Sequence, residues 1–362
     1  MCTTRLARSA VARPRLRAAW ASSLLVALAA CDVPPTPAVP RASVVAPPHL
    51  GASDARAGPP SSRLARLQFE VSGRAFQLPV VTGTVGGVRT LLLVDTGASA
   101  NMVTGWIARQ AKLPLSSHGD TGRDHVGKTV TTARTSRPSL AVDGWGALPD
   151  RETLVVEVPA ALERLGIGAF LSPQRLDAAA VVLDLPRGEL REGRDLGDEK
   201  GALAEWASLS RPEARGLPEA RVCLDRASLV GGLAFVLPAR LRPPGGSPPR
   251  EAELLVDTGA QRTDLLTTSP AGRALSPGSE PGESVFAASG TITTRRLRGV
   301  DLEIGDVRAR LDVELLPGST HPSCPRDGVL GMDVLRRCVL VFGQPPGGPP
   351  SLHARCLVDD LR

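Results

Sequence analysis

The run LLLVDTGAS occupies residues 91–99, and a closely similar run, LLVDTGAQ, occupies residues 254–261. In each run an apolar segment of buried-strand length ends in a carboxylate, a hydroxyl and a glycine, so the acid leaves the core on a tight turn. A single Asp-Thr-Gly tripeptide is a weak signal, because most are plain turns. Two copies in matching settings predict a pair of carboxylates that are available for acid/base chemistry.

The similarity between the two halves of the chain extends beyond these runs. Upstream, residues 76–81 (FQLPVV) and 234–239 (AFVLPA) each precede a glycine-containing turn, which predicts that each half opens with a hairpin feeding the acid-bearing strand. Downstream, FLSPQRL at residues 170–176 aligns without gaps with VLGMDVL at residues 329–335. We infer an internal duplication that forms two lobes.

Length and composition agree with two lobes built from short strands. The chain has 362 residues and 42% hydrophobic content, with 37 glycines, 33 prolines and no tyrosine. Its formal charge of +6 is concentrated in the first 30 residues, and without them 38 basic residues face 37 acidic ones. No basic stripe with interleaved aromatic residues is visible, so we expect no nucleic-acid partner.

The N-terminus is typical of an export signal. Five arginines and no acid precede the apolar stretch from Ala18 to Ala30, whose length of about 13 residues is too short to span a bilayer. The run LAAC at residues 28–31 resembles a bacterial lipobox, which predicts that Cys31 is lipidated and becomes the new N-terminus. The alternative is an ordinary signal peptide followed by a chance cysteine.

We therefore predict a monomer that is exported and lipid-anchored to a bacterial membrane, on its periplasmic or cell-surface side. Asp32 follows the lipidation site, and since sorting rules differ between phyla, the inner and outer membranes both stay open. The predicted segments are a signal peptide (1–30), a tether rich in Pro, Ala and Ser (31–65), an N-terminal lobe (66–192), an interlobe connection with a short helix over 199–209 (193–220), and a C-terminal lobe (221–362).

Four cysteines remain besides Cys31, and in an exported protein they suggest two disulfides with three possible pairings. Cys338 and Cys356 flank a predicted hairpin turn at residues 343–350, so we favour that pair together with Cys223 and Cys324. No CxxC or CxxH spacing is present and the five histidines are scattered, so we expect neither a metal nor another cofactor.

These motifs resemble the bacterial retropepsin-like branch of the pepsin and retropepsin superfamily of aspartic peptidases. The resemblance implies an all-β, bilobal fold, in which two homologous β lobes enclose a central active-site cleft. Each lobe of that fold threads an apolar-apolar-Gly strand beside its turn, and DGVLGMDVL at residues 327–335 matches this second motif. Lobe one places Ser172 where glycine is expected, so either Ser172 or Gly168 occupies that position.

The resemblance also implies roles for the two turns. Asp95 and Asp257 would share one proton and activate the water that attacks a peptide bond in a peptide or protein substrate. The other turn residues would support them, the threonines by hydrogen bonds between the turns and the glycines by letting backbone amides approach the carboxylates: Thr96, Gly97, Thr258 and Gly259.

Two hairpins, predicted over residues 119–132 and 284–294, are candidate flaps over the substrate. Charged residues near the first tip, Asp124, His125 and Lys128, could contact substrate or could simply be solvated.

Two other functions compete with an endopeptidase. A catalytically inactive, lipid-anchored peptide-binding scaffold of the same fold would explain Ser172 and the unusual Gln261. A nucleotide-binding protein similar to actin and the sugar kinases would also have duplicated Asp-x-Gly turns. Export to a compartment without ATP argues against that second alternative.

Overall fold

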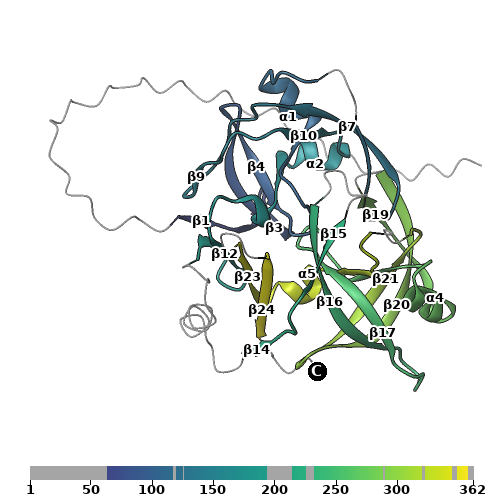
Figure 1. The fold of residues 1–362 in the computed structure, drawn as a ribbon. Helices are drawn as coiled ribbons and strands as arrows, with labels where there is room; N and C mark the ends of the chain where they lie inside the picture. Colours follow the sequence, from purple (N-terminus) through teal and green to yellow (C-terminus); the bar gives the residue numbers. More distant parts are fainter. Residues whose placement is uncertain are drawn as a thin grey trace, which may run out of the picture. The chain divides into compact units, whose positions relative to one another are not determined.

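The computed structural model describes residues 63–116, 120–124, 126–193, 214–225, 232–287, 290–319, 323–344 and 349–357 (Figure 1). The predicted signal peptide, Cys31, most of the tether and the predicted helix over 199–209 lie outside these residues. Within them, no helix has both the length and the apolar character that crossing a membrane requires. The fold is all-β and bilobal, as the sequence predicts.

The sheet of lobe one contains ten strands and is built around the first Asp-Thr-Gly run. Its order is β6 (Asp120–Arg123), β7 (Thr129–Thr135), β10 (Thr153–Val156), β5 (Met102–Thr104), β11 (Ile167–Leu171), β4 (Val88–Val94), β3 (Arg74–Val85), β8 (Leu140–Val142) and β9 (Gly146–Ala147), with β2 (Gln68–Val71) paired to β3.

The sheet of lobe two contains eight strands and repeats this arrangement around the second run. Its order is β15 (Arg221–Asp225), β16 (Gly232–Arg242), β17 (Arg250–Val256), β22 (Gly328–Leu330), β18 (Asp264–Leu266), β21 (Val307–Leu316), β20 (Gly290–Ile304) and β19 (Glu280–Ala287). In both lobes the predicted first hairpin is present, as β3 with β4 and as β16 with β17.

A third sheet takes strands from both halves of the chain. Its order is β1 (Leu64–Arg66), β13 (Glu189–Glu192), β12 (Ala180–Asp184), β23 (Cys338–Gly343), β24 (Ser351–Leu357) and β14 (Ala214–Gly216). At its centre β12 of lobe one pairs antiparallel with β23 of lobe two, with Val182 opposite Val341. Every residue of β12 is buried, so the two lobes share part of one core here.

The helices of the described residues are short and connect strands. They are α1 (Gly105–Gln110), α2 (Ala160–Arg164), η1 (Pro173–Arg175), α4 (Pro270–Leu275), η2 (Ser276–Gly278) and α5 (Met332–Leu335).

The structure resolves the register of lobe one. Leu171 pairs with Val94 in lobe one just as Leu330 pairs with Val256 in lobe two. The amide of Asp95 donates to the Leu171 carbonyl at 2.9 Å, and the amide of Asp257 donates to the Leu330 carbonyl at 3.1 Å. Ser172 is therefore the counterpart of Gly331, whereas Gly168 lies in an irregularity of the β11–β4 pairing.

Two disulfides are present, with the pairings that the sequence analysis favours. Cys338 and Cys356 face each other across the β23–β24 hairpin, with their Cα atoms 3.9 Å apart. Cys223 of β15 is joined to Cys324, which lies shortly before β22. The second bond closes a loop of 101 residues and fastens the edge of the lobe-two sheet to the segment that leads into the site.

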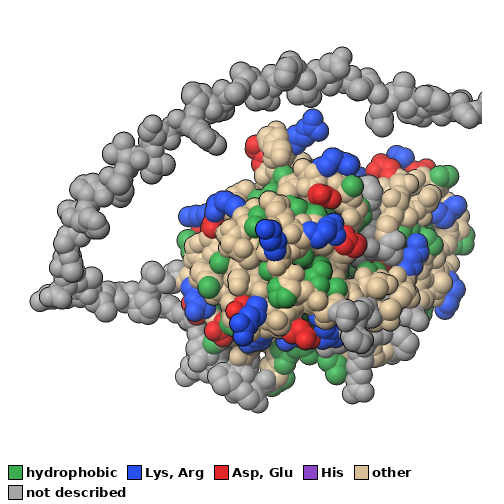
Figure 2. All heavy atoms as spheres, turned by 90° about the horizontal axis from the view of Figure 1, so that it is seen from above, with side chains coloured by type: hydrophobic (Ala, Val, Ile, Leu, Met, Phe, Trp, Pro, Cys, Tyr) green, Lys and Arg blue, Asp and Glu red, His purple; other side chains and the backbone are tan. Residues whose placement is uncertain are grey.

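The surface carries charges of both signs. Figure 2 shows basic and acidic side chains interspersed over one face of the molecule. Ion pairs such as Arg240–Glu251, at 3.0 Å, are at least half exposed on both sides. An exposed pair of this kind contributes at most about 1 kcal/mol, so burial of apolar strands is the main source of stability.

Candidate active site

The two Asp-Thr-Gly turns meet where the lobes join, and their threonines hold them together. The amide of Thr96 donates to the Thr258 hydroxyl at 3.1 Å, and the amide of Thr258 donates to the Thr96 hydroxyl at 2.9 Å. The Thr96 hydroxyl donates onward to the carbonyl of Val256 at 2.8 Å, and the Thr258 hydroxyl to that of Val94 at 2.7 Å. Both side chains are buried, so the four bonds lock the turns in a symmetrical arrangement.

The glycines of the two turns are required for space. Neither has a positive φ. A Cβ atom on Gly97 would lie 2.5 Å from Cγ of Asp257, and one on Gly259 would lie 2.8 Å from Cγ of Asp95. Each carboxylate thus rests against the opposite turn, and a side chain at either glycine would collide with it.

Backbone amides orient both carboxylates. The Ala98 amide donates to Oδ1 of Asp95 at 2.9 Å, and the Gly259 amide donates to Oδ1 of Asp257 at 2.8 Å. Burial and then the neighbouring charge of Asp257 raise the pKa of the Asp95 carboxyl well above its ordinary value of 3.8. Two adjacent carboxyls, one of which resists ionisation, can supply an acid and a base to the same substrate.

Neighbouring strands support the turns in matching ways. The Ser172 amide donates to Oδ1 of Asn101 at 2.9 Å, and the Gly331 amide donates to the hydroxyl of Thr263 at 3.2 Å. Gln174 adds a bond from its Nε2 to the Thr96 carbonyl at 3.2 Å. The sequence analysis missed these contacts because nothing local distinguishes Asn101 or Gln174 from ordinary loop residues.

Both candidate flaps are hairpins, β6 with β7 and β19 with β20. The tip of the first one docks on lobe two, where Val126 is buried in a cluster with Leu266, Ile292 and Leu316. The Ser319 amide also donates to the Val126 carbonyl at 3.2 Å. Because Ile292 belongs to the second hairpin, both candidate flaps contribute to this cluster.

The charged residues near the first tip have different roles. Asp124 is buried, and its Oδ1 accepts the amides of Val126 at 3.2 Å and Lys128 at 2.9 Å. Asp124 therefore stabilises the turn at the tip of the hairpin. His125 lies outside the described residues.

Lobe two also buries acids that the sequence analysis did not single out. Asp264 of β18 is 6% exposed, and Glu314 of β21 is 3% exposed. Burial, followed by the charges of Asp257 and Asp333, raises the pKa of Asp264 well above its ordinary value. The available signal was a carboxylate inside an apolar strand, as in the runs DLL at 264–266 and VELL at 313–316.

No group of three or more His, Cys, Asp or Glu side chains in the described part of the chain is arranged to hold a metal ion. A family model described as aspartyl protease matches the chain twice, over residues 81–168 and again over residues 245–334. The chain belongs to the aspartyl protease family. Each match contains one Asp-Thr-Gly turn, and the second also contains the whole of β22, the strand beside that turn, whereas the first ends at residue 168 within β11. The family's unit therefore occurs once in each lobe. No curated protein matches the chain.

Proposed function

We propose that this protein is an aspartic endopeptidase whose catalytic acids are Asp95 and Asp257. The observation that carries the proposal is the contact of each carboxylate with the opposite Asp-Thr-Gly turn, which brings the two acids together between the lobes. Two like charges at this separation cannot both ionise cheaply, and the raised pKa of Asp95 agrees with one shared proton.

In the proposed reaction, the ionised carboxylate takes a proton from a water molecule, which attacks the carbonyl carbon of a peptide bond. The protonated carboxyl donates a hydrogen bond to the carbonyl oxygen as negative charge develops there. Collapse of the tetrahedral intermediate breaks the C–N bond, and the leaving amine takes a proton from the pair. The carboxyls exchange protons without a covalent intermediate.

The substrate is a peptide or protein segment that reaches the two carboxylates beneath the paired hairpins. The apolar cluster to which Val126 and Ile292 both belong supports this arrangement, because hairpins that are joined across the two lobes have to open before a chain can enter. We further propose that the protein is exported and lipid-anchored through Cys31, a proposal that is supported by the sequence of residues 1–31 alone.

The test is cleavage of a peptide library by the purified protein and by its Asp95→Asn and Asp257→Asn variants. Each substitution is expected to lower kcat/KM by about 10²- to 10⁴-fold, and the double variant is expected to be no worse because the two acids work as a unit. Asp143→Asn is the matched control, since Asp143 binds Thr82 and Arg89 on the surface.

Substantial activity in either single variant would contradict the shared pair. If no peptide is cleaved, binding of a statine-type transition-state mimic separates the two remaining functions. An active site binds such a mimic far more tightly than substrate, whereas an inactive scaffold has no reason to do so. The family match favours a protease over the nucleotide-binding alternative.

A further inference from the structure

The two lobes have the same topology but unlike walls beside their acids. Strand pairing shows which positions of the two lobes are equivalent. Met102 pairs with Leu154 in lobe one, and at the equivalent positions of lobe two Asp264 pairs with Glu314. The fifth residue after the acid is Ala100 in lobe one and Arg262 in lobe two. Lobe one is thus apolar at positions where lobe two carries charge.

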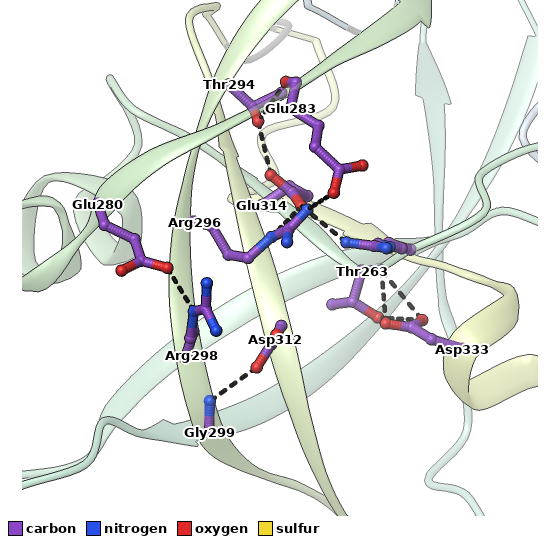
Figure 3. A network of polar contacts seen from close by, with 11 residues as sticks. Thr263, Glu280, Glu283, Thr294, Arg296, Arg298, Gly299, Asp312, Glu314 and Asp333 are labelled. Carbon is purple, nitrogen blue, oxygen red and sulfur yellow. Dashed lines mark hydrogen bonds and ion pairs between the residues drawn. The ribbon is translucent and has the colours of Figure 1, made fainter.

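Glu314 lies at the centre of the network of polar contacts in lobe two (Figure 3). Its buried carboxylate accepts the Thr294 hydroxyl at 2.6 Å, Nε of Arg296 at 2.7 Å and Nη1 of Arg262 at 3.1 Å. Arg296 also contacts Glu283 at 3.1 Å. The network therefore connects both strands of the second hairpin to the loop that follows Asp257.

Arg296 and Arg262 differ in how far their side chains are exposed and in how many carboxylates they pair with. The Arg296 side chain is 13% exposed and is paired with two carboxylates, whereas the Arg262 side chain is 41% exposed. A guanidinium has five N–H donors. Within the described residues, the Arg262 side chain uses one of them, in its bond to Glu314. It shares that acceptor oxygen with Arg296. Arg262 is thus a cation that is held in place and still has donors to offer.

Arg262 also lies close to the two acids along the backbone. A Cβ atom on Gly331 would lie 2.4 Å from the backbone carbonyl of Arg262, so the two segments are in close contact. Gly331 directly follows Leu330, whose carbonyl accepts the Asp257 amide at 3.1 Å. Arg262 therefore belongs to the same packed unit as Asp257.

We propose that Arg262 determines specificity by binding the carboxylate of an Asp or Glu side chain in the substrate. The proposal rests on the proposed function. Because the two turns are related by an approximate twofold axis, a peptide that crosses the pair of acids lies with one half along each lobe. The half along lobe two meets Arg262, whose planar guanidinium binds a carboxylate through two parallel hydrogen bonds. The half along lobe one meets the partly exposed Ala100 and Met102, so apolar substrate side chains are expected there.

The experiment compares peptides that carry Glu, Gln or Lys at each position on either side of the scissile bond. Assays run near pH 6, where a Glu side chain of ordinary pKa about 4.3 is ionised. The wild-type protein is expected to cleave the Glu peptide about tenfold better than the Gln peptide, by kcat/KM, at one position on one side only. This preference is expected to weaken as salt is added.

Four variants test the assignment. Arg262→Ala places the lobe-one residue type at this position and is expected to bring the ratio of kcat/KM for the Glu and Gln peptides close to one. Arg262→Lys is expected to restore part of that ratio. Arg262→Glu is expected to favour the Lys peptide. Arg298→Ala is the control, because Arg298 lies on β20 with Arg296, is 67% exposed and pairs with Glu280 rather than with Glu314.

An unchanged Glu preference in Arg262→Ala, or no preference in the wild-type protein, would overturn the proposal while leaving the endopeptidase intact. If no peptide is cleaved and the statine-type mimic does not bind, it is the proposed function that fails. The same comparison is then made by calorimetry with peptides whose scissile bond is reduced, and equal affinities for the Glu and Gln forms would again refute the role of Arg262.

Discussion

Asp95 occupies a position that favours its neutral form. Desolvation and the charge of Asp257 outweigh the amide bonds from Ala98 and Gly97 that favour the carboxylate. A carboxyl with a raised pKa binds its proton more tightly in the folded protein than in the unfolded one. Its contribution to stability is therefore present below the ordinary pKa of 3.8 and is lost as pH rises through the folded-state value.

Asp95→Asn is accordingly expected to become more stable, relative to the wild-type protein, as pH rises from about 4 to 7. Asparagine keeps an acceptor for the Ala98 amide but does not carry the charge that burial penalises. The measurement is the free energy of unfolding by denaturant at several pH values, for both proteins.

Asp143→Asn provides a control of opposite sign. Hydrogen bonds from Thr82 and then Arg89 lower the pKa of Asp143, so its contribution is present above the ordinary pKa and is lost as pH falls. This variant is expected to lose stability relative to wild type as pH rises through the range below about 4, and to show no further trend between about pH 4 and 7. If Asp95→Asn, like this control, shows no change relative to wild type between about pH 4 and 7, the pKa of Asp95 is not raised.

Among the elements, the β6–β7 hairpin differs most from an ordinary surface hairpin. Its tip is fastened to lobe two by the Val126 cluster and by the bond from the Ser319 amide. A Cβ atom on Gly318 would lie 2.6 Å from the Val126 carbonyl, so the backbones approach closely. The hairpin can therefore leave lobe two only by exposing Val126.

Val126→Ser is expected to loosen this attachment. Full burial of a valine side chain is worth about 1.5–3 kcal/mol, and most of that is lost with a hydroxyl that has no assigned partner. Amide hydrogen exchange in β6 and β7 is expected to speed up by about tenfold or more, while β12 and β23 at the lobe junction keep their protection. The measurement is hydrogen exchange followed by mass spectrometry.

Thr131→Ser is the matched control, because Thr131 lies on β7 of the same hairpin and its side chain is exposed. If exchange in the hairpin is the same in Val126→Ser and in wild type, the tip does not hold the hairpin down.

At the scale of the whole molecule, the third sheet contains strands of both lobes and so joins the two lobes by backbone hydrogen bonds. β12 and β23 pair over five residues, from Ala180 with Gly343 to Asp184 with Val339. Hydrogen bonds between the threonines connect the lobes again at the active site. The two acids are thus held from both sides, which is the preorganisation that the proposed shared proton requires.

The proposed lipid anchor acts on the whole molecule as well. Cys31→Ser is expected to move the protein from the detergent phase to the aqueous phase in Triton X-114 partitioning, because one substitution removes the acylated residue. Cys2→Ser is the control, since Cys2 would leave with the signal peptide. Continued partitioning of Cys31→Ser into detergent would contradict lipidation at this residue.

Much of the fold and of the candidate site follows from local signals in the sequence. Apolar runs that end in Asp-Thr-Gly predicted the strands and turns, and the duplication predicted the two lobes. The turn at residues 343–350 predicted which cysteines face each other. The strands, turns and hairpin are each decided by residues within one short segment of the chain, and the duplication repeats that pattern in the second half.

The remaining features depend on residues far apart in the chain. Ser172 rather than Gly168 is the counterpart of Gly331 because strand register, rather than residue type, decides the position. Gly97 is needed because the carboxylate of Asp257 leaves no room there for a side chain. Glu314 accepts hydrogen bonds from both Arg262 and Arg296, which come from different segments of the chain. The sequence by itself determined which residues could do the chemistry. Only the tertiary structure decided which of them meet, because contacts between distant segments are set by packing of the whole core.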